Sequence, residues 1–166
     1  MKGYDVFPNF FTVEEISTVE REFNKFQWEL SGWSDSPEEK LFWFKDLHNS
    51  QFIKPLFHNK AECILGKKVE TFRVYGNGQA HGQCGSFHKD TPGCEYTIVY
   101  FLHKNWKPEY GGHLVFIDDN GNYIDSIWPE TNSAVFFNSN IKHCALEPTI
   151  HCKSQRVSVA YKCNVL

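Results

Sequence analysis

Beyond Gly66 the chain carries short runs rich in Val, Ile, Tyr and Phe, separated by Gly, Asn, Asp and Pro at irregular intervals. Short apolar runs bounded by turn-forming residues are typical of strands. We expect strands near residues 68–75, 85–88, 95–102, 113–117, 123–128, 134–137 and 157–162. About seven or eight strands with no helix between them favour a sandwich or jelly roll over a parallel sheet.

The first 66 residues have a helical character instead. Thr12–Glu15 is a capping-box sequence, and the apolar residues after it recur at three- and four-residue steps, which predicts a helix over residues 13–28. Ser36 followed by Pro37 predicts the start of a short second helix. An apolar segment over residues 52–65 predicts another helix, which Gly66 would terminate.

These patterns predict a mainly β protein with N-terminal helices, of the α+β class. We expect a single domain over residues 1–166, with a helical part over 1–66 and a jelly-roll core over 67–166. A chain of 166 residues is long enough to bury one packed core, and its 15 Phe and 5 Trp suit a sheet-rich interior.

Composition and charge also narrow the function. The net charge is only -3 and the basic residues are scattered, so nucleic acid is not favoured as a partner. No stretch has the run of apolar residues that a signal peptide or a membrane span requires, so we expect a cytoplasmic protein with no membrane partner. Six cysteines without a Cys-x-x-Cys pair indicate reduced thiols rather than disulfides or a zinc-thiolate site.

Three residues have the types and spacing of metal ligands. His88 and Asp90 lie two apart in an extended segment, so both side chains can face the same point. His143 follows the apolar run 134–137 at the entrance to an expected turn and can supply a third ligand. Two imidazoles and one carboxylate leave open coordination positions, as an Fe(II) oxygenase requires. The alternative is a chance His-x-Asp in a chain with 8 His and 20 acidic residues.

Arg156 and Ser158 are also two residues apart on the last expected strand, so both can face one pocket. A guanidinium donates two parallel hydrogen bonds to a carboxylate, and a hydroxyl can add a third. This pair could anchor a dicarboxylate, or Arg156 could equally form an ordinary surface ion pair. The loop over 76–85 could close over a substrate or simply connect two strands.

Taken in order, several segments resemble the 2-oxoglutarate and Fe(II)-dependent dioxygenases, and within them the prolyl 4-hydroxylase-like branch. The segments are His88-Lys89-Asp90, 96–102 running into 105–106, 110–116, 141–143 and Arg156-Val157-Ser158. The resemblance implies a double-stranded β-helix, which is the cupin-like jelly roll, with helices packed on its outer face.

The resemblance also implies roles for single residues. His88, Asp90 and His143 would bind iron, Arg156 would bind the far carboxylate of 2-oxoglutarate, and Ser158 would support it. Tyr75 resembles a tyrosine that lines the co-substrate pocket, although an ordinary core aromatic would look the same. The chain departs from the collagen-type pattern, which has lysine in place of Arg156.

The activity implied is hydroxylation of a substrate C–H bond with O2, with succinate and CO2 released and ascorbate as a candidate reductant. A peptidyl prolyl or other protein side chain is the expected substrate. A small molecule or free amino acid is the alternative, and so is a non-catalytic jelly-roll binding module. Nucleic-acid demethylation is less expected, because relatives of that kind carry arginine where this chain has Lys162.

Overall fold

The computed structural model describes residues 3–36, 38 and 41–166. In chain order the elements are β1 (Tyr4–Phe7), α1 (Val13–Phe23), β2 (Glu29–Gly32), β3 (Phe42–Asp46), α2 (Ile53–Leu65), β4 (Val69–Gln79), β5 (Tyr96–Phe101), the 3-10 helix Pro108–Tyr110, β6 (Leu114–Ile117), β7 (Tyr123–Ile127), β8 (Ala134–Asn138), β9 (Lys142–Ala145) and β10 (Arg156–Val165).

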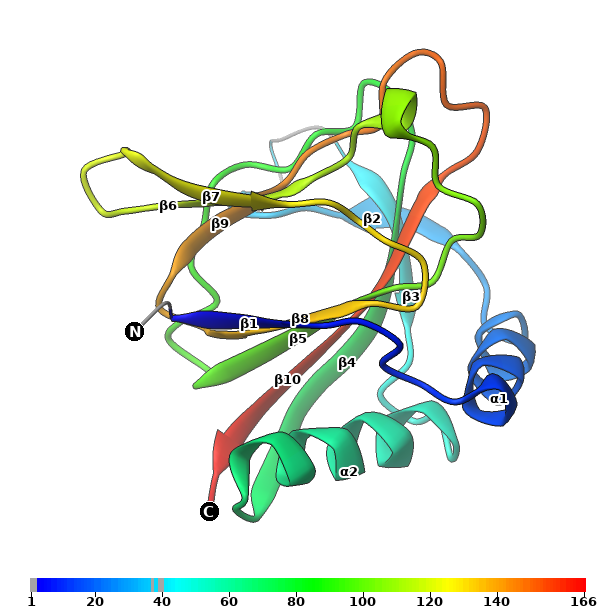
Figure 1. Cartoon of the computed structure of the whole chain (residues 1–166), viewed down its shortest axis with the longest axis vertical. Coiled ribbons are helices and arrows are strands. Elements are labelled where there is room, and N and C mark those ends of the chain that lie inside the picture. The colour runs from blue at the N-terminus through cyan, green and yellow to red at the C-terminus, as the bar shows by residue number, and fades with distance from the viewer. Residues whose placement is uncertain (1–2, 37, 39–40) are drawn as a thin grey trace.

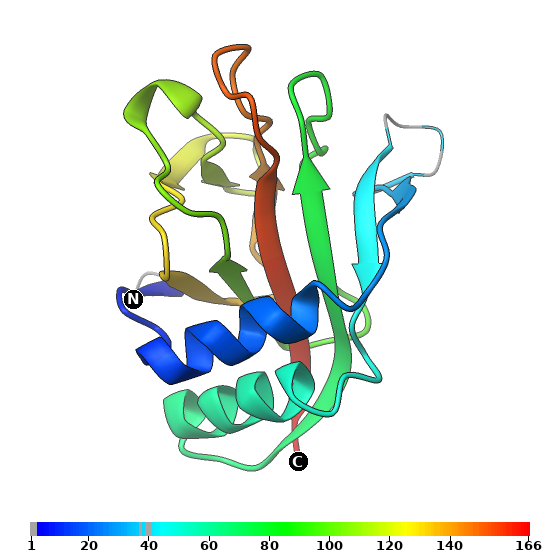
Figure 2. The same cartoon turned by 90° about the vertical axis from the view of Figure 1, so that its right-hand side faces the viewer.

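The strands form two antiparallel sheets. The large sheet has the order β1-β8-β5-β10-β4-β3-β2, and the small sheet has the order β7-β6-β9. Figure 1 shows the small sheet opposite the β1, β8 and β5 part of the large one. Both helices lie across the outer face of the large sheet, over β4 and β10 (Figure 2). The predicted jelly roll with helices on its outer face is therefore confirmed.

The large sheet contributes to a buried cluster on each of its two faces. Its outer face packs against the helices through a cluster that includes Phe57, which has no exposed surface and contacts the rings of Phe11, Tyr100 and Tyr161. Its inner face packs against the small sheet through a second cluster, made of Tyr4, Val99, Phe101, Leu114, Phe116, Val135 and Phe137. Period-two alternation along each strand sends successive side chains to these two layers.

The helix signals are confirmed in part. The side chain of Thr12 accepts from the backbone N–H of Glu15, and the side chain of Glu15 accepts from the N–H of Thr12, as a capping box requires. α1 ends at Phe23 rather than at residue 28, and Trp28 folds back onto the Phe23 ring. α2 matches the prediction and ends at Gly66, which adopts φ 62°. The helix expected after Ser36 lies outside the described residues.

Several strand predictions need correction. The helical description of residues 1–66 holds for α1 and α2 but not for β1, β2 and β3, which extend the large sheet at its two ends. Segments of four or five residues carry little periodicity, so pairing made them strands: β1 pairs with β8, β3 with β4, and β2 with β3. Residues 85–88 do not form the expected strand, and His88 makes an isolated bridge with His143 instead. His143 lies on β9 instead of at a turn, and residues 76–79 of the expected loop belong to β4.

All six cysteines are free thiols, as predicted. Within the described part of the chain, no helix is long and apolar enough to cross a membrane.

The burial of Phe57 leads to a test of the layer between helix and sheet. Phe57→Ala should lower the free energy of unfolding by about 3–5 kcal/mol, because the lost ring leaves a cavity among rigid aromatic neighbours. Urea unfolding followed by circular dichroism measures this change. Phe52→Ala removes a half-exposed ring nearby and should cost less than about 1 kcal/mol. Equal losses in the two variants would contradict the packing described here.

Candidate active site

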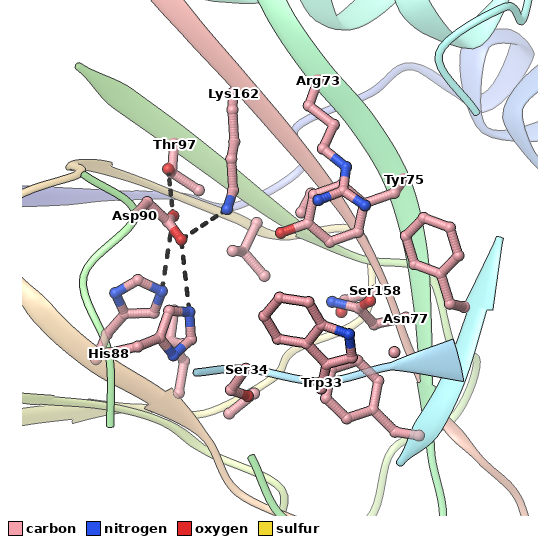
Figure 3. A pocket seen from close by; sticks show the side chains of 18 of the residues that line it. Trp33, Ser34, Arg73, Tyr75, Asn77, His88, Asp90, Thr97, Ser158 and Lys162 are labelled. Carbon is pink, nitrogen blue, oxygen red and sulfur yellow. Dashed lines mark hydrogen bonds and ion pairs between the residues drawn. The ribbon is translucent and has the colours of Figure 1, made fainter. Parts of the chain in front are cut away.

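A cavity of about 510 Å³ lies on the inner face of the large sheet. The register between β4 and β10 pairs Gln79 with Arg156, Asn77 with Ser158, Tyr75 with Ala160 and Arg73 with Lys162, and all of these residues line the cavity. Because side chains two apart on a strand share a face, one pairing register places three polar or charged pairs, together with Tyr75 and Ala160, in the same space. Figure 3 shows several of these side chains around the cavity.

His88, Asp90 and His143 converge on one point of the cavity. Their potential ligand atoms all lie within 4.8 Å of one another. Nε2 of His88 is 3.5 Å from Asp90 Oδ1, and Nε2 of His143 is 3.8 Å from Asp90 Oδ2. His88 and His143 are 55 positions apart in the chain. They meet because they form an antiparallel bridge, with backbone N···O distances of 3.0 and 2.9 Å.

Both imidazoles are oriented by the backbone. Nδ1 of His88 is 2.9 Å from the carbonyl oxygen of Ser86, and Nδ1 of His143 is 3.0 Å from that of Ile141. A carbonyl oxygen only accepts, so each Nδ1 carries a proton, and in the neutral ring Nε2 is the nitrogen with a lone pair for a metal. A backbone partner on the other ring nitrogen is the usual support of a metal-binding histidine.

Asp90 is held by groups on the sheet. Its side chain is 2% exposed, and it accepts hydrogen bonds from Thr97 Oγ1 at 2.7 Å and from Lys162 Nζ at 2.6 Å (Figure 3). Burial alone would raise the pKa of Asp90, but the hydrogen bond with His88 and the positive charge of Lys162 hold it well below its usual range. The carboxylate is therefore ionised and ready to bind a cation.

The two histidines differ in protonation. Burial disfavours the charged form of both, and it lowers the pKa of His143 to about 4. For His88, burial acts in the same direction, but hydrogen bonds to Asp90 and Ser86 raise its pKa overall. Neutral imidazole is the form that binds metal, so metal binding would release any proton that His88 holds. Two imidazole nitrogens and an ionised carboxylate fit Fe(II) with open positions opposite.

Arg156 forms a second charged centre in the cavity. It has no exposed surface, and its Nε donates to the carbonyl of Gly112 at 2.6 Å. Nη1 lies 3.2 Å from Gln79 Oε1 and 3.4 Å from Ser158 Oγ. Nη2 is buried and has no hydrogen-bond partner among the described residues.

Burial lowers the pKa of Arg156 to about 10, so the group is still charged at neutral pH. A buried cation without a carboxylate partner is costly, which indicates that a ligand supplies the missing anion. Its contacts fit the far carboxylate of 2-oxoglutarate.

The sequence-predicted residues therefore meet in one place: His88, Asp90, His143, Arg156, Ser158 and Tyr75 all line this cavity. Arg156 does not form the surface ion pair considered as an alternative, since it is fully buried. Sequence reasoning missed Lys162, which lies on the same face of β10 as Arg156 and Ser158. Continuing the two-residue alternation along that strand would have placed it in the pocket.

The sequence model of the 2OG-Fe(II) oxygenase superfamily matches residues 71–161, which is more than half of the chain. The chain belongs to this superfamily. Members of the superfamily use Fe(II) and 2-oxoglutarate, and the donor set and the buried guanidinium of this 2OG-Fe(II) oxygenase fit both. The resemblance to the 2-oxoglutarate and Fe(II)-dependent oxygenases that was read from the sequence is confirmed at the level of the superfamily.

Solved structures share the fold of this oxygenase. A prolyl hydroxylase from Trichoplax adhaerens, in complex with a hypoxia inducible factor peptide fragment, has a TM-score of 0.75 and 13% identity, over 98% of this chain and 84% of that one. A 2OG-Fe(II) oxygenase family oxidoreductase from Burkholderia pseudomallei has a TM-score of 0.78 and 13% identity, over 97% and 84%. HygX from Streptomyces hygroscopicus, with nickel, 2-oxoglutarate and hygromycin B bound, has a TM-score of 0.68 and 11% identity, over 97% and 82%. A search of curated proteins found no match.

The buried pair of Asp90 and Lys162 can be tested in metal-free protein. Lys162→Met should lower the free energy of unfolding by about 3–5 kcal/mol, since it leaves a buried carboxylate without its cation. Urea unfolding in the presence of a chelator measures the loss. Lys104→Met breaks the exposed pair with Glu20 and should cost less than about 1 kcal/mol. If Lys162→Met costs no more than Lys104→Met, the pair does not stabilise the fold.

Proposed function

We propose that this oxygenase is a dioxygenase that hydroxylates a C–H bond of its substrate, most readily a peptidyl prolyl or other protein side chain. In this proposal His88, Asp90 and His143 bind the iron. Arg156 and Ser158 bind the far carboxylate of 2-oxoglutarate, and Tyr75 lines the co-substrate pocket. The observation that carries the proposal is the meeting of the three ligand atoms and an unpartnered buried guanidinium in one cavity.

The overall reaction balances with O2 as oxidant. One oxygen atom enters succinate as 2-oxoglutarate loses CO2, and the other enters the substrate as a hydroxyl group. Fe(II) would supply the redox chemistry when it is bound. Since only three protein side chains would bind it, positions would be left for co-substrate and oxygen. Ascorbate would serve as reductant.

The side chains of the protein orient and shield the reactants. Arg156 fixes the far carboxylate of 2-oxoglutarate with charge-assisted hydrogen bonds, which sets the direction of its keto acid end. Thr97 and Lys162 hold the Asp90 carboxylate in place, so the ligand geometry does not depend on the bound ion alone. The side chains of Val99 and Leu114 form an apolar part of the cavity wall and reduce the access of water.

A protein substrate is supported by the fold shared with a prolyl hydroxylase that binds a peptide fragment. The second candidate is a small molecule, supported by the fold shared with HygX, whose structure contains hygromycin B. Succinate release measured against a panel of proline-containing peptides and small metabolites, with ascorbate present, separates the two.

The iron site is tested by the colour of the complex. Anaerobic protein with Fe(II) and 2-oxoglutarate should show a visible charge-transfer band, and admitting oxygen should yield succinate. His143→Ala should weaken iron binding by at least about 100-fold, because it removes a direct ligand. His151→Ala removes an exposed histidine outside the cavity and should leave the band unchanged. If wild-type protein gave neither band nor succinate, the chain would be the non-catalytic binding module.

The co-substrate site is tested at Arg156. Arg156→Met should raise the apparent Kd for 2-oxoglutarate by about 30-fold or more, since losing one partner of a buried charged pair costs about 2–5 kcal/mol. Titration of the anaerobic band measures this value. Ser158→Ala removes a single hydroxyl and should raise it by less than about 10-fold. Arg156→Lys keeps the charge and separates loss of binding from loss of fold. Unchanged affinity in folded Arg156→Met would place the co-substrate elsewhere.

A further inference from the structure

Arg73 is an exposed cation at the edge of the cavity, and its role is not explained by the iron or co-substrate sites. It lies on β4 two residues before Tyr75, and its guanidinium carbon is 4.8 Å from the centre of the Tyr75 ring and 5.2 Å from that of Phe44. Stacking on two rings holds the group in a defined position without using its hydrogen-bond donors. Its N–H groups make no hydrogen bond or ion pair with the residues that the structure describes, so a ligand can use them.

The other cations of the cavity already have partners. Lys162 binds Asp90, and Lys89 forms an ion pair with Asp119 at 2.7 Å. Arg156 matches the co-substrate. Within residues 3–36, 38 and 41–166, no carboxylate lies within ion-pair distance of Arg73, and Asp90 supplies the only carboxylate of the described cavity lining. The cavity of a chain with net charge -3 thus concentrates positive charge, and Arg73 is the cation in it that has no carboxylate partner among the described residues.

Arg73 and Arg156 lie too far apart along the strands to bind the same short anion. Arg73 pairs with Lys162, whereas Arg156 pairs with Gln79 near the opposite end of the same β4–β10 ladder. These two positions are separated by about 20 Å of extended strand. A short dicarboxylate anchored by Arg156 cannot span that distance. Lys162 contacts Asp90, so Arg73 lies at the metal end of the cavity, where a substrate would enter.

The surface around Arg73 suits an apolar body attached to the anion. Trp33 is 48% exposed and Phe72 is 50% exposed, and both line this cavity together with Phe44. The side-chain oxygen of Asn77 is buried and has no hydrogen-bond partner among the described residues, so it can accept from a polar group of a ligand. Figure 3 shows Trp33, Arg73, Tyr75 and Asn77 around the space that Asp90 and His88 face.

We propose that the primary substrate presents a carboxylate to Arg73 while its apolar part rests against Trp33, Phe44 and Phe72, which directs a C–H bond toward the His88–Asp90–His143 group. As an assignment of substrate, this rests on the proposed function. The carboxylate can come from an Asp or Glu beside the target residue of a peptide, or from a small apolar acid. In both cases the group that Arg73 would bind is a carboxylate.

Paired probes isolate the carboxylate. 4-Phenylbutyrate is compared with its amide, and a blocked peptide with proline next to aspartate is compared with the same peptide carrying asparagine. Isothermal titration calorimetry measures each affinity for full-length protein, so the readout needs no turnover. In wild-type protein we expect one of the two acids to bind about 10- to 100-fold more tightly than its amide, because a charged hydrogen bond replaces a neutral one. Which acid does so identifies the source of the carboxylate.

Substitution then assigns the preference to Arg73. Arg73→Met should reduce the preference for acid over amide to less than about threefold, and Arg73→Lys should retain part of it. Arg21→Met, which removes an exposed arginine on α1, is the matched control and should retain all of it. Circular dichroism verifies that each variant is folded.

The outcomes separate this proposal from the proposed function. If neither acid binds more tightly than its amide, or if the preference persists in Arg73→Met, the subsite is overturned even when Fe(II), 2-oxoglutarate and oxygen yield succinate. If the preference depends on Arg73 but no succinate forms, the Arg73 subsite is supported and the reaction given under the proposed function is contradicted.

Discussion

The antiparallel pairing of β4 with β10 is the constraint on which the rest of the structure depends. Its register sends Val74, Val159 and Tyr161 to the helix-covered face and the polar pairs from Arg156 to Lys162 to the cavity. A shift of one residue would exchange the two faces, burying the charges under the helices and exposing the core. Burial of the apolar face under α2 therefore fixes the geometry of the polar face as well.

Electrostatic pairing then decides what the cavity can bind. Asp90 and Lys162 satisfy each other inside the protein, whereas the guanidinium of Arg156 keeps a buried donor that no described residue satisfies. Two negative ligand groups, one near the metal ligands and one near Arg156, would balance the charges that the fold has placed there. The buried donor of Arg156 thus indicates what charge a ligand would carry and where it would lie.

Much of the site could be predicted from the sequence, because period-two spacing needs only a strand to place His88 with Asp90, and Arg156 with Ser158, on one side. Alternation along β10 also predicts that Lys162 faces the pocket, but its contact with Asp90 could not be predicted. The positions of Thr97 and Arg73 could not be predicted either, since each depends on which strand lies next to which. The short strands β1, β2 and β3 were missed because so few residues carry little periodicity. β1 and β3 pair with the distant strands β8 and β4, and β2 is placed only by its pairing with β3.

The sequence alone determined which residue types are available to bind a metal and a dicarboxylate, the helix start at Thr12, the helix end at Gly66 and the β character of the region beyond it, because each depends on residue type and near-neighbour spacing. Only the tertiary structure decided that His143 on β9 meets His88 across a bridge, that Arg156 is buried with no carboxylate partner among the described residues, and that Lys162 holds Asp90. These contacts join residues far apart in the chain, and sheet register, which brings them together, is a property of the whole fold.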